Sequence, residues 1–202
     1  MIMKIEELIR NNRSCRRFYE DDRPGPEKLK TLVNLARLSA SAANRQPLRF
    51  ILSWQPDTNA SIFPCLGWAG YLTDWAGPSE GERPAAYIII TGDTRITDNF
   101  WCDHGIAAQS ILLGAREMGL AGCMIGAFNG DRLRQAVNIP DHLKIMLVLA
   151  LGKPRETVVI DDLGPDGDIR YWRDEAGRHH VPKRSLDDLI IDLSDRKSGS
   201  EG

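Results

Sequence analysis

The 202-residue chain lacks the long apolar segments that cross a membrane. Its longest apolar runs, such as Ala85 to Ile90 and Ile145 to Leu151, fall far below the ~20 residues that span a bilayer. The first residues, MIMKIEELIRNN, contain no apolar stretch and no small-residue cleavage site of the kind found in secretory signals. We therefore expect a cytoplasmic protein with no membrane partner.

Cysteine is scarce and scattered. The four cysteines form no CxxC pair and no Cys/His group at metal-ligand spacing. His179 and His180 are adjacent, so on an extended strand their side chains point to opposite faces and are poorly placed to share one ion. We expect reduced, mostly buried thiols and no bound metal.

A large excess of charge of either sign is also absent. Lys and Arg number 26 and Asp and Glu 28, a formal net charge of −2, which gives no general attraction to nucleic acid or to an anionic membrane. The signatures GxGxxG, GxxxxGK[ST], GxSxG and HExxH are missing. A nucleotide-like ligand must therefore be held in another way, and we expect no nucleic-acid partner.

The composition that remains, 42% hydrophobic and 27% charged, is that of an ordinary globular domain. A chain of this size can bury roughly 70% of the surface that its unfolded form exposes. Helical and strand patterns alternate irregularly, which predicts a single α+β or mixed α/β domain over residues 1–193. The closing SDRKSGSEG, residues 194–202, is expected to be disordered.

Apolar periodicity and turn signals define the expected elements. Helices are expected up to Asn12, from Pro26 to Ala40, over 103–118, and in a short stretch at 133–137. Strands are expected over 50–54, 85–93, 123–125 and 144–152, and turn signals mark 55–61. The 103–118 helix is apolar around much of its circumference, so one side can face the sheet while the other needs a second layer or a second subunit.

Charges dominate beyond Pro154. Residues 168–184, DIRYWRDEAGRHHVPKR, are predicted to form an extended hairpin that turns at Glu175 to Gly177. Ser185 and Asp188, three residues later, resemble a capping box and predict a helix over SLDDLIIDL, residues 185–193.

Two basic segments are candidate phosphate-binding sites. Arg13, Ser14 and Arg16 lie in the run NRSCRRF just past the first helix. A phosphate dianion is well held by two positive donors and a hydroxyl or amide, and arginine provides a bidentate fork for it. Lys183 and Arg184 offer a second source of such charge. Each run is also compatible with an ordinary solvated basic turn.

Two further segments are suited to a flat ligand. In the run SASAANRQ, small residues let a ligand approach the backbone closely, while Asn44 and Gln46 offer donor and acceptor groups. Gly126 and Ala127 end a strand and would leave backbone N–H groups free to point at such a ligand. The alternatives are a polar loop between helix and strand, and a plain transition from strand to loop.

Taken in order, these segments resemble the nitroreductase family of FMN-dependent oxidoreductases. The family's R-S-x-R-x-F-like motif is matched at residues 13–18, and its S-x-x-N-x-Q-P segment at 41–47. An aspartate that opens a long helix ending in Gly-Leu is similar to Asp103 and the later GAREMGLAG, and LALGKP resembles the family's strand end. The resemblance runs from about Ile5 to Leu193.

The resemblance implies a nitroreductase-like α+β fold with a central mixed sheet flanked by helices. It also implies a homodimer with FMN at the subunit interface and a C-terminal extension that reaches the partner subunit. Arg13, Ser14 and Arg16 would hold the phosphate and ribityl end of FMN, with Lys183 or Arg184 adding charge.

The same resemblance assigns the flavin-facing residues. Ser41, Ala42 and Asn44 would reach the flavin from the partner subunit, and Gln46 belongs to the same cofactor-binding segment. The backbone at 126–127 would lie near the reactive ring nitrogen, where a donor tunes the flavin. The chain departs from the family at Asn12, where a second basic residue is frequent, at Leu48, frequently Trp, and at Gly126, where an acidic residue is frequent.

The implied activity is hydride transfer from NADH or NADPH to FMN, followed by ping-pong reduction of a small nitroaromatic or quinone-type acceptor. No catalytic side-chain acid or base is expected, because the cofactor carries the chemistry. Alternatives are another flavin reaction on the same fold, such as reductive dehalogenation, dehydrogenation or oxygen-dependent flavin breakdown, and a non-catalytic FMN-binding protein.

Overall fold

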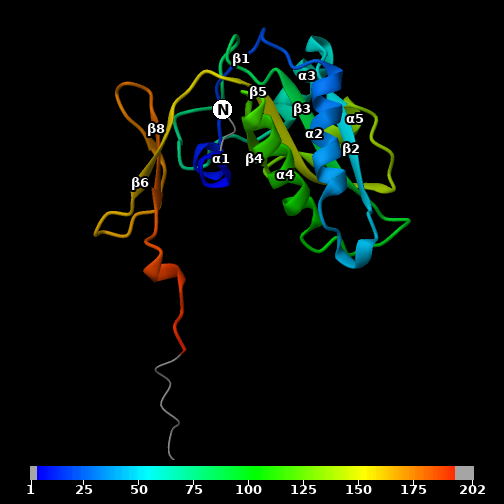
Figure 1. Ribbon diagram of the computed structural model, residues 1–202. Helices are drawn as coiled ribbons and strands as arrows, with labels where there is room; N and C mark the ends of the chain where they lie inside the picture. The colour runs from blue at the N-terminus through cyan, green and yellow to red at the C-terminus, as the bar shows by residue number, and fades with distance from the viewer. Residues whose placement is uncertain (1–3, 194–202) are drawn as a thin grey trace, which may run out of the picture. The chain divides into compact units, whose positions relative to one another are not determined.

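The computed structural model describes residues 4–193, which form two compact units (Figure 1). The first runs up to Thr157 and the second begins at Val158. The division falls close to Pro154, where the charge-rich part of the sequence begins. A single domain over 1–193 stays a prediction, and the tail predicted for 194–202 lies outside the described residues.

A five-stranded sheet forms the centre of the first unit. Its strands are β1 (Phe18–Tyr19), β2 (Leu48–Ser53), β3 (Ala86–Asp93), β4 (Ala121–Ile125) and β5 (Leu143–Pro154). The long β5 pairs with β3 along one edge, with β4 along the other edge over residues 148–152, and with β1 at residues 153–154. Strand β2 forms the outer neighbour of β3. These ladders are antiparallel, and a parallel bridge joins Ser14 to Gly122.

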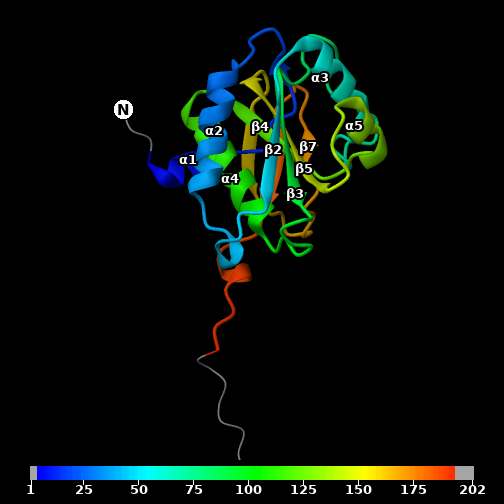
Figure 2. The same cartoon turned by 90° about the vertical axis from the view of Figure 1, so that its right-hand side faces the viewer.

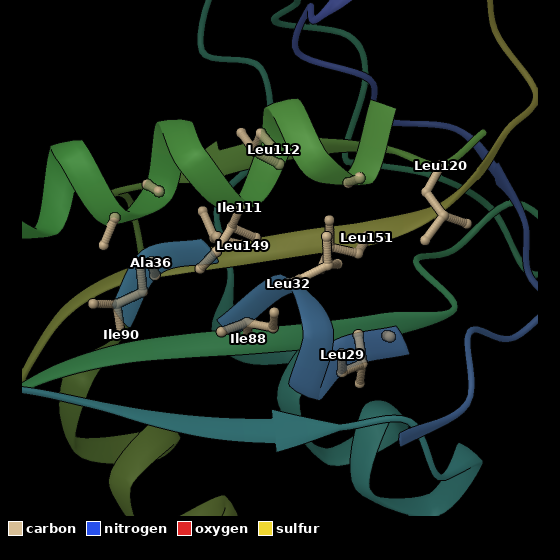
Figure 3. Close-up of a cluster of buried hydrophobic side chains, with 14 residues drawn as sticks. Leu29, Leu32, Ala36, Ile88, Ile90, Ile111, Leu112, Leu120, Leu149 and Leu151 are labelled. Carbon is tan, nitrogen blue, oxygen red and sulfur yellow. The ribbon is translucent and has the colours of Figure 1, made fainter. Parts of the chain in front are cut away.

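The two central strands are buried on both faces and separate two hydrophobic cores. In β3, Ile88 and Ile90 belong to one core, whereas Tyr87 and Ile89 belong to the other. This division follows from the strand period of two, which sends successive side chains to opposite faces. Figure 3 shows the first core, where Ile88 and Leu149 of the sheet meet helical leucines and alanines.

Helices cover both faces of this sheet (Figure 2). On one face are α2 (Pro26–Leu38) and α4 (Asp103–Glu117), which contribute to the first core, and on the other are α3 (Pro56–Ile62) and α5 (Gly130–Ala136). The first helix, α1 (Ile5–Asn11), contacts α4. Layered helices and sheet with antiparallel pairing confirm the α+β fold class.

The apolar circumference of α4 is explained largely within this unit. One side of α4 packs on the sheet through Ile111 and Ala115, and another packs against α2. The helices approach closely at Gly114, where an added Cβ would lie 2.2 Å from a methyl carbon of Leu35. Ile106 and Leu113 stay half-buried. Of the two expected partners for this side of the helix, a second layer or a second subunit, the first unit supplies a second layer, α2.

Two features of the first unit differ from the sequence expectations. Residues 55–61, expected as a turn, contain most of α3, which starts at Pro56, a residue suited to the first helical position. The helix has only two buried residues, Asn59 and Ile62, so it leaves almost no apolar periodicity in the sequence. Two short 3-10 helices, η1 (Ala42–Asn44) and η2 (Phe63–Cys65), were also not anticipated.

The second unit is a small sheet of β6 (Val158–Asp162), β7 (Trp172–Arg173) and β8 (His179–Lys183). The β7–β8 pair is antiparallel, and Gly177 turns with a φ of 75°, so the predicted hairpin is confirmed. The parallel partner β6 was not expected.

The helix predicted over residues 185–193 is wrong. The amide of Asp188 does donate to Ser185 Oγ at 3.1 Å, as a helix cap requires, but only one 3-10 turn, η3 (Asp187–Leu189), follows. Large apolar side chains around this turn, including Ile191, are exposed, so no packing within this unit stabilises a longer helix. Across residues 4–193, no helix is both long and apolar enough to cross a membrane.

Candidate functional site

The segment after α1 is held close to that helix by its first arginine. Arg13 donates from Nε to the Asn12 carbonyl at 2.7 Å and from Nη2 to the Ile9 carbonyl at 3.2 Å. Both acceptors lie at the C-terminal end of α1, where a positive side chain complements unpaired carbonyls and the helix dipole. Partial burial lowers the pKa of Arg13. This arginine therefore has a structural role in addition to any role in binding.

Arg16 is the buried charge of the segment, with 9% of its surface exposed. Its amide donates to the Glu156 carboxylate, and its Nη1 donates to the Ser14 carbonyl at 3.4 Å. Between them, the Cys15 amide donates to the Gly122 carbonyl at 3.0 Å, which attaches the segment to the start of β4. Backbone hydrogen bonds thus fix Arg16 beside the edge of the sheet.

Arg17 faces a different partner. Its guanidinium makes a two-point ion pair with Glu82, at 2.8 Å and 2.5 Å. This hydrogen bonding raises the pKa of Arg17. Of the three arginines in NRSCRRF, Arg17 is committed to a salt bridge within the fold, which agrees with its omission from the predicted phosphate-binding set.

A cavity of about 250 Å³, here called the β4 cavity, opens beside Arg16. Its lining consists of Arg16, residues 67–70 and residues 123–127. The structure therefore brings Arg16 together with Gly126 and Ala127, as predicted from widely separated motifs. Ser14 lies two residues before Arg16 and accepts from it through its carbonyl, while the side chain of Arg13 is hydrogen-bonded back to the end of α1.

The wall of the β4 cavity formed by 126–127 is open backbone. Both residues are exposed, and a Cβ added at Gly126 would meet no atom within 4 Å. In residues 4–193 neither amide donates to a carbonyl outside the strand ladders, whereas the Ala127 carbonyl accepts from the Gly67 amide at 2.7 Å. Exposed backbone at 126–127 in one cavity with the guanidinium of Arg16 suits an electron-rich ligand.

The cysteine in this wall is inert. Burial raises the pKa of Cys123, and burial followed by the nearby Glu156 raises the pKa of Cys15 to about 12. Both thiols therefore stay protonated at neutral pH, where a nucleophile would need to be a thiolate. Three of the four cysteines are buried and Cys102 is exposed.

The other predicted ligand segment, Ser41 to Gln46, is a strained turn between α2 and β2. Ala43, Asn44 and Gln46 have φ values of 49°, 51° and 50°, a region that residues with side chains seldom occupy. Asn44 and Gln46 are exposed, and Gln46 Nε2 donates to Asn44 Oδ1 at 3.1 Å. Ser41 and Ala42 are half-buried beneath them.

A second cavity of about 300 Å³, the β2 cavity, lies beside this turn. Its lining is mixed: apolar side chains of α2, α4 and β2 lie beside polar or charged ones, which are Arg37, Ser39, Ser41, Gln46, Arg49 and Asp103. It shares no lining residue with the β4 cavity. Strands β2 and β4 are separated by β3 and β5, so the two strands lie roughly 14 Å apart. One chain therefore holds the predicted residues in two separate places.

Lys183 and Arg184 belong to the second unit, where both are exposed. Lys183 ends β8, and its carbonyl accepts from the Leu163 amide at 2.9 Å. Their contribution to a phosphate site stays a prediction. In the part of the chain from 4 to 193, no group of three His, Cys, Asp or Glu side chains is arranged to hold a metal ion.

Sequence reasoning missed three residues near these cavities. Trp68 comes from an aromatic stretch that gave no clear pattern, yet it lines the β4 cavity. Glu156 lies after the strand end and gave no signal of its contact with Arg16. Asp103 was noted as the start of a helix, and that position was the available sign of its contact with Ser41.

Several known proteins are similar to this chain in sequence or in structure. The oxygen-insensitive NADPH nitroreductase of Helicobacter acinonychis is 25% identical to this chain over 186 residues, covering 74% of the chain and 87% of the relative. The FMN reductase (NADPH) of Bacillus subtilis is 25% identical over 162 residues, covering 73% and 65%. A nitroreductase family protein from Clostridium novyi has a similar structure, with a TM-score of 0.65 at 24% identity, covering 76% and 86%.

The sequence model of the Nitroreductase family matches residues 9–64 and 73–153. The first range contains Arg13 to Arg16 and Ser41 to Gln46, and the second contains Asp103 and the wall at 126–127. The family match thus covers the lining of both cavities except residues 67–70, and it ends before the second unit begins. This chain belongs to the nitroreductase family.

Proposed function

We propose that this protein is an FMN-dependent NAD(P)H oxidoreductase that reduces a small acceptor. The observation that carries the proposal is the buried guanidinium of Arg16 in one cavity with the open amides of Gly126 and Ala127. Names of relatives support it, because one is an FMN reductase using NADPH and another an NADPH nitroreductase.

The residues of the β4 cavity fit the parts of FMN. The guanidinium of Arg16 lines this cavity, and an arginine fork can hold a phosphate dianion through charge-assisted hydrogen bonds. Met124 and Ile125 offer apolar surface to a ring system, and the amides at 126–127 offer donors to ring nitrogens. Glu156, which accepts the amide of Arg16, adds negative charge beside this site and would moderate the affinity.

Cavity size supports a site shared by two subunits. The β4 and β2 cavities measure about 250 and 300 Å³, whereas ligand sites typically measure about 300–1,000 Å³. Neither cavity alone is large enough for a whole mononucleotide with its flavin. In a homodimer, the β4 cavity of one chain would be completed by Asn44 and Gln46 of the other, which are exposed in the single chain.

Exposed apolar residues support the proposed reach of the C-terminal extension. Leu186, Leu189 and Ile191 are 70%, 66% and 83% exposed. Three large apolar side chains within six residues are unusual on a free surface and suit burial against a second subunit. We place this extension against the partner chain of the same dimer.

In the proposed reaction the protein binds and orients while the cofactor performs the redox chemistry. When bound, FMN supplies a ring that takes a hydride from NADH or NADPH and passes electrons on. Arg16, with Arg13 and Ser14 nearby, holds the phosphate end, and the amides at 126–127 hold the ring edge. The apolar wall excludes water. A small nitroaromatic or quinone would enter the same cavity after the nicotinamide leaves, in a ping-pong sequence.

An absorption spectrum tests the proposal directly. The freshly purified protein, or the protein after addition of FMN, should show flavin bands near ~450 nm that bleach when NADH or NADPH is added without oxygen. The faster donor identifies the preferred nicotinamide. A protein that neither retains nor binds FMN would overturn the assignment.

A complementation experiment tests the shared site. Arg16→Ala and Gln46→Ala each damage both sites of their own homodimer, but a mixed dimer contains one site with both changes and one with neither. Mixing the two variants under conditions of subunit exchange should therefore restore tight FMN binding to about half of the sites in mixed dimers. Failure to restore binding, or a monomer by light scattering, would contradict the two-subunit site.

A further inference from the structure

Asp103, the first residue of α4, is a buried carboxylate without a cationic partner. Only 4% of its surface is exposed, and among residues 4–193 no basic side chain forms an ion pair with it. A buried charge of this kind is expensive unless hydrogen bonds and local dipoles compensate it. The N-terminus of the 15-residue helix α4 supplies part of that compensation.

The remaining compensation comes from the Ser41–Gln46 turn. Asp103 Oδ2 accepts the Ser41 hydroxyl at 2.6 Å, and Oδ1 accepts the Ala42 amide at 3.0 Å. Ser41 Oγ in turn accepts the Gln46 amide at 3.0 Å. One carboxylate is thereby connected to both ends of the turn through three hydrogen bonds.

The hydrogen bond to Asp103 determines which interactions the Ser41 hydroxyl can still make. A hydroxyl has a single proton, and that proton is donated to Asp103. Ser41 therefore cannot donate a hydrogen bond to a cofactor while the contact exists. The exposed side chains of the turn that can still donate to a ligand are those of Asn44, Arg45 and Gln46.

The turn needs such an anchor because its backbone is strained. Three residues with side chains have positive φ, and each costs of order 1–3 kcal/mol unless the surroundings hold it in place. Residues 43–46 are exposed, so packing contributes little to holding them. The hydrogen bonds to Asp103 and Ser41 reach both ends of the turn, and Arg49 Nη1 adds a contact to the Gln46 carbonyl at 3.2 Å.

We propose that Asp103 is a positioning residue, which fixes the Ser41–Gln46 turn in the shape that presents Asn44 and Gln46 to FMN. Ser41 acts as the relay between Asp103 and Gln46. This inference rests on the proposed function, since it assigns residues of the same cofactor site.

The variant Asp103→Asn tests the proposal at nearly constant size. An asparagine whose Oδ1 accepts the Ala42 amide presents its Nδ2 to Ser41 Oγ, so the charge-assisted contact from the hydroxyl is replaced by a neutral one of opposite direction and the anchor of the turn is weakened. We expect the FMN dissociation constant to rise at least about tenfold, as for a lost hydrogen bond to a charged group. Ser41→Ala, which removes the relay only, should raise it by about three- to tenfold.

Ser110→Ala is the matched control. Ser110 lies in the same helix α4, and its hydroxyl contacts Ser39 Oγ at 2.7 Å, so it also connects α4 with the end of α2. It is not part of either ligand segment. FMN affinity should be unchanged in this variant. Urea unfolding of each protein without FMN shows whether a variant has lost stability of the whole fold. A variant with unchanged stability but weaker FMN binding has lost only the geometry of the turn.

A double-mutant cycle distinguishes positioning from general damage. If Asp103 acts through the turn, Gln46→Ala should cost little extra FMN affinity once Asp103→Asn is present. Arg16→Ala, at the other cavity, should cost the same factor in either background. Additive effects of Asp103→Asn and Gln46→Ala would overturn the positioning role.

The outcomes separate the two proposals. If the wild-type protein binds no FMN, the proposed function and this inference both fail. If it binds FMN and both Asp103→Asn and Ser41→Ala bind equally well, the function stands and only the positioning role fails. If Asp103→Asn does not fold, the same cycle with Ser41→Ala and Gln46→Ala decides the matter.

Discussion

The two ligand segments of the first unit are built in opposite ways. The Asn12–Arg17 segment is fixed by backbone hydrogen bonds and carries its key charge, Arg16, in a buried position. The Ser41–Gln46 turn is exposed over residues 43–46, strained in its backbone, and fixed at both ends by one carboxylate. The first segment supplies a positive charge for the ligand, and the second supplies a backbone shape that orients its side chains.

This difference predicts how each segment responds to substitution. Backbone contacts survive a change of side chain, so substitutions in the first segment should remove only the interaction of the replaced group. In the turn, one substitution at the anchor should remove several groups at once, because their geometry depends on it. The following changes test that contrast, beginning with the largest expected effect.

Arg16→Ala should produce the largest loss of FMN affinity. A hydrogen bond to a charged group contributes about 1.5–3 kcal/mol, which corresponds to an increase in the dissociation constant of about 10- to 150-fold. Titration of the apoprotein by quenching of flavin fluorescence measures it. Arg23→Ala, an exposed arginine paired with Asp21 at 3.3 Å, is the control and should bind as the wild type does. Equal affinity of all three proteins would remove Arg16 from the phosphate site.

Gln46→Ala and Asn44→Ala should each have a smaller effect. Neutral hydrogen bonds contribute about 0.5–1.5 kcal/mol, which corresponds to a two- to twelvefold loss of FMN affinity. The same titration applies. Because the two side chains are hydrogen-bonded to each other at 3.1 Å, the double variant should lose less than the product of the single losses. A loss as large as that of Arg16→Ala would show that the turn supplies more than shape.

The arginine cluster was predictable from the sequence because its signal is local. Arg13, Ser14 and Arg16 fall within four residues, and the residue types alone suggest an anion. The same holds for β3 and β5, whose dense apolar runs predict strands buried on both faces. The structure adds that Arg17 belongs to Glu82, a choice that depends on a residue 65 positions away.

What the sequence could not predict depends on distant partners. The roles of Asp103 and Glu156 follow from contacts across 61 and 140 positions. Helix α3 was missed because a seven-residue helix with two buried positions has almost no periodicity. The helix expected over 185–193 failed for the opposite reason, since its capping pattern is present but its apolar residues have nothing in the second unit to pack on.

Ala43→Gly tests the strain in the turn. Glycine adopts positive φ at no steric cost, but it also increases the freedom of the unfolded chain, so part of the relief is cancelled. We expect the free energy of unfolding to rise by up to about 1 kcal/mol in urea titrations. Ala40→Gly, just before the turn at a position without positive φ, should change it in the opposite direction. Destabilisation by both changes would show that Ala43 is not strained.

The smallest effect concerns the second unit, where His180 precedes Lys183 in β8. Burial alone would lower the pKa of His180, but hydrogen bonds from Nδ1 to Asp161 at 2.8 Å and from Nε2 to Asp174 at 3.3 Å raise it above its ordinary value. Asp174 also pairs with Arg178 at 2.6 Å and keeps a pKa of about 2 despite the opposing effect of burial.

The sign of the pH dependence follows from the raised pKa of His180. A raised folded-state pKa means that the imidazolium stabilises the strands fully below its unfolded pKa, ~6.5, and that this contribution is lost as pH rises through the folded pKa. Amide hydrogen exchange in β8, corrected for its intrinsic pH dependence, should therefore lose protection as pH rises through the raised folded-state pKa, while β3 keeps its protection. His180→Gln should remove the pH dependence and leave protection low throughout.

Strand β8 ends at Lys183, and Arg184 follows it. A simultaneous weakening of FMN binding in this pH range that disappears in His180→Gln would therefore support the predicted contribution of Lys183 and Arg184 to phosphate binding. Unchanged FMN binding would leave the phosphate to Arg16 and its neighbours.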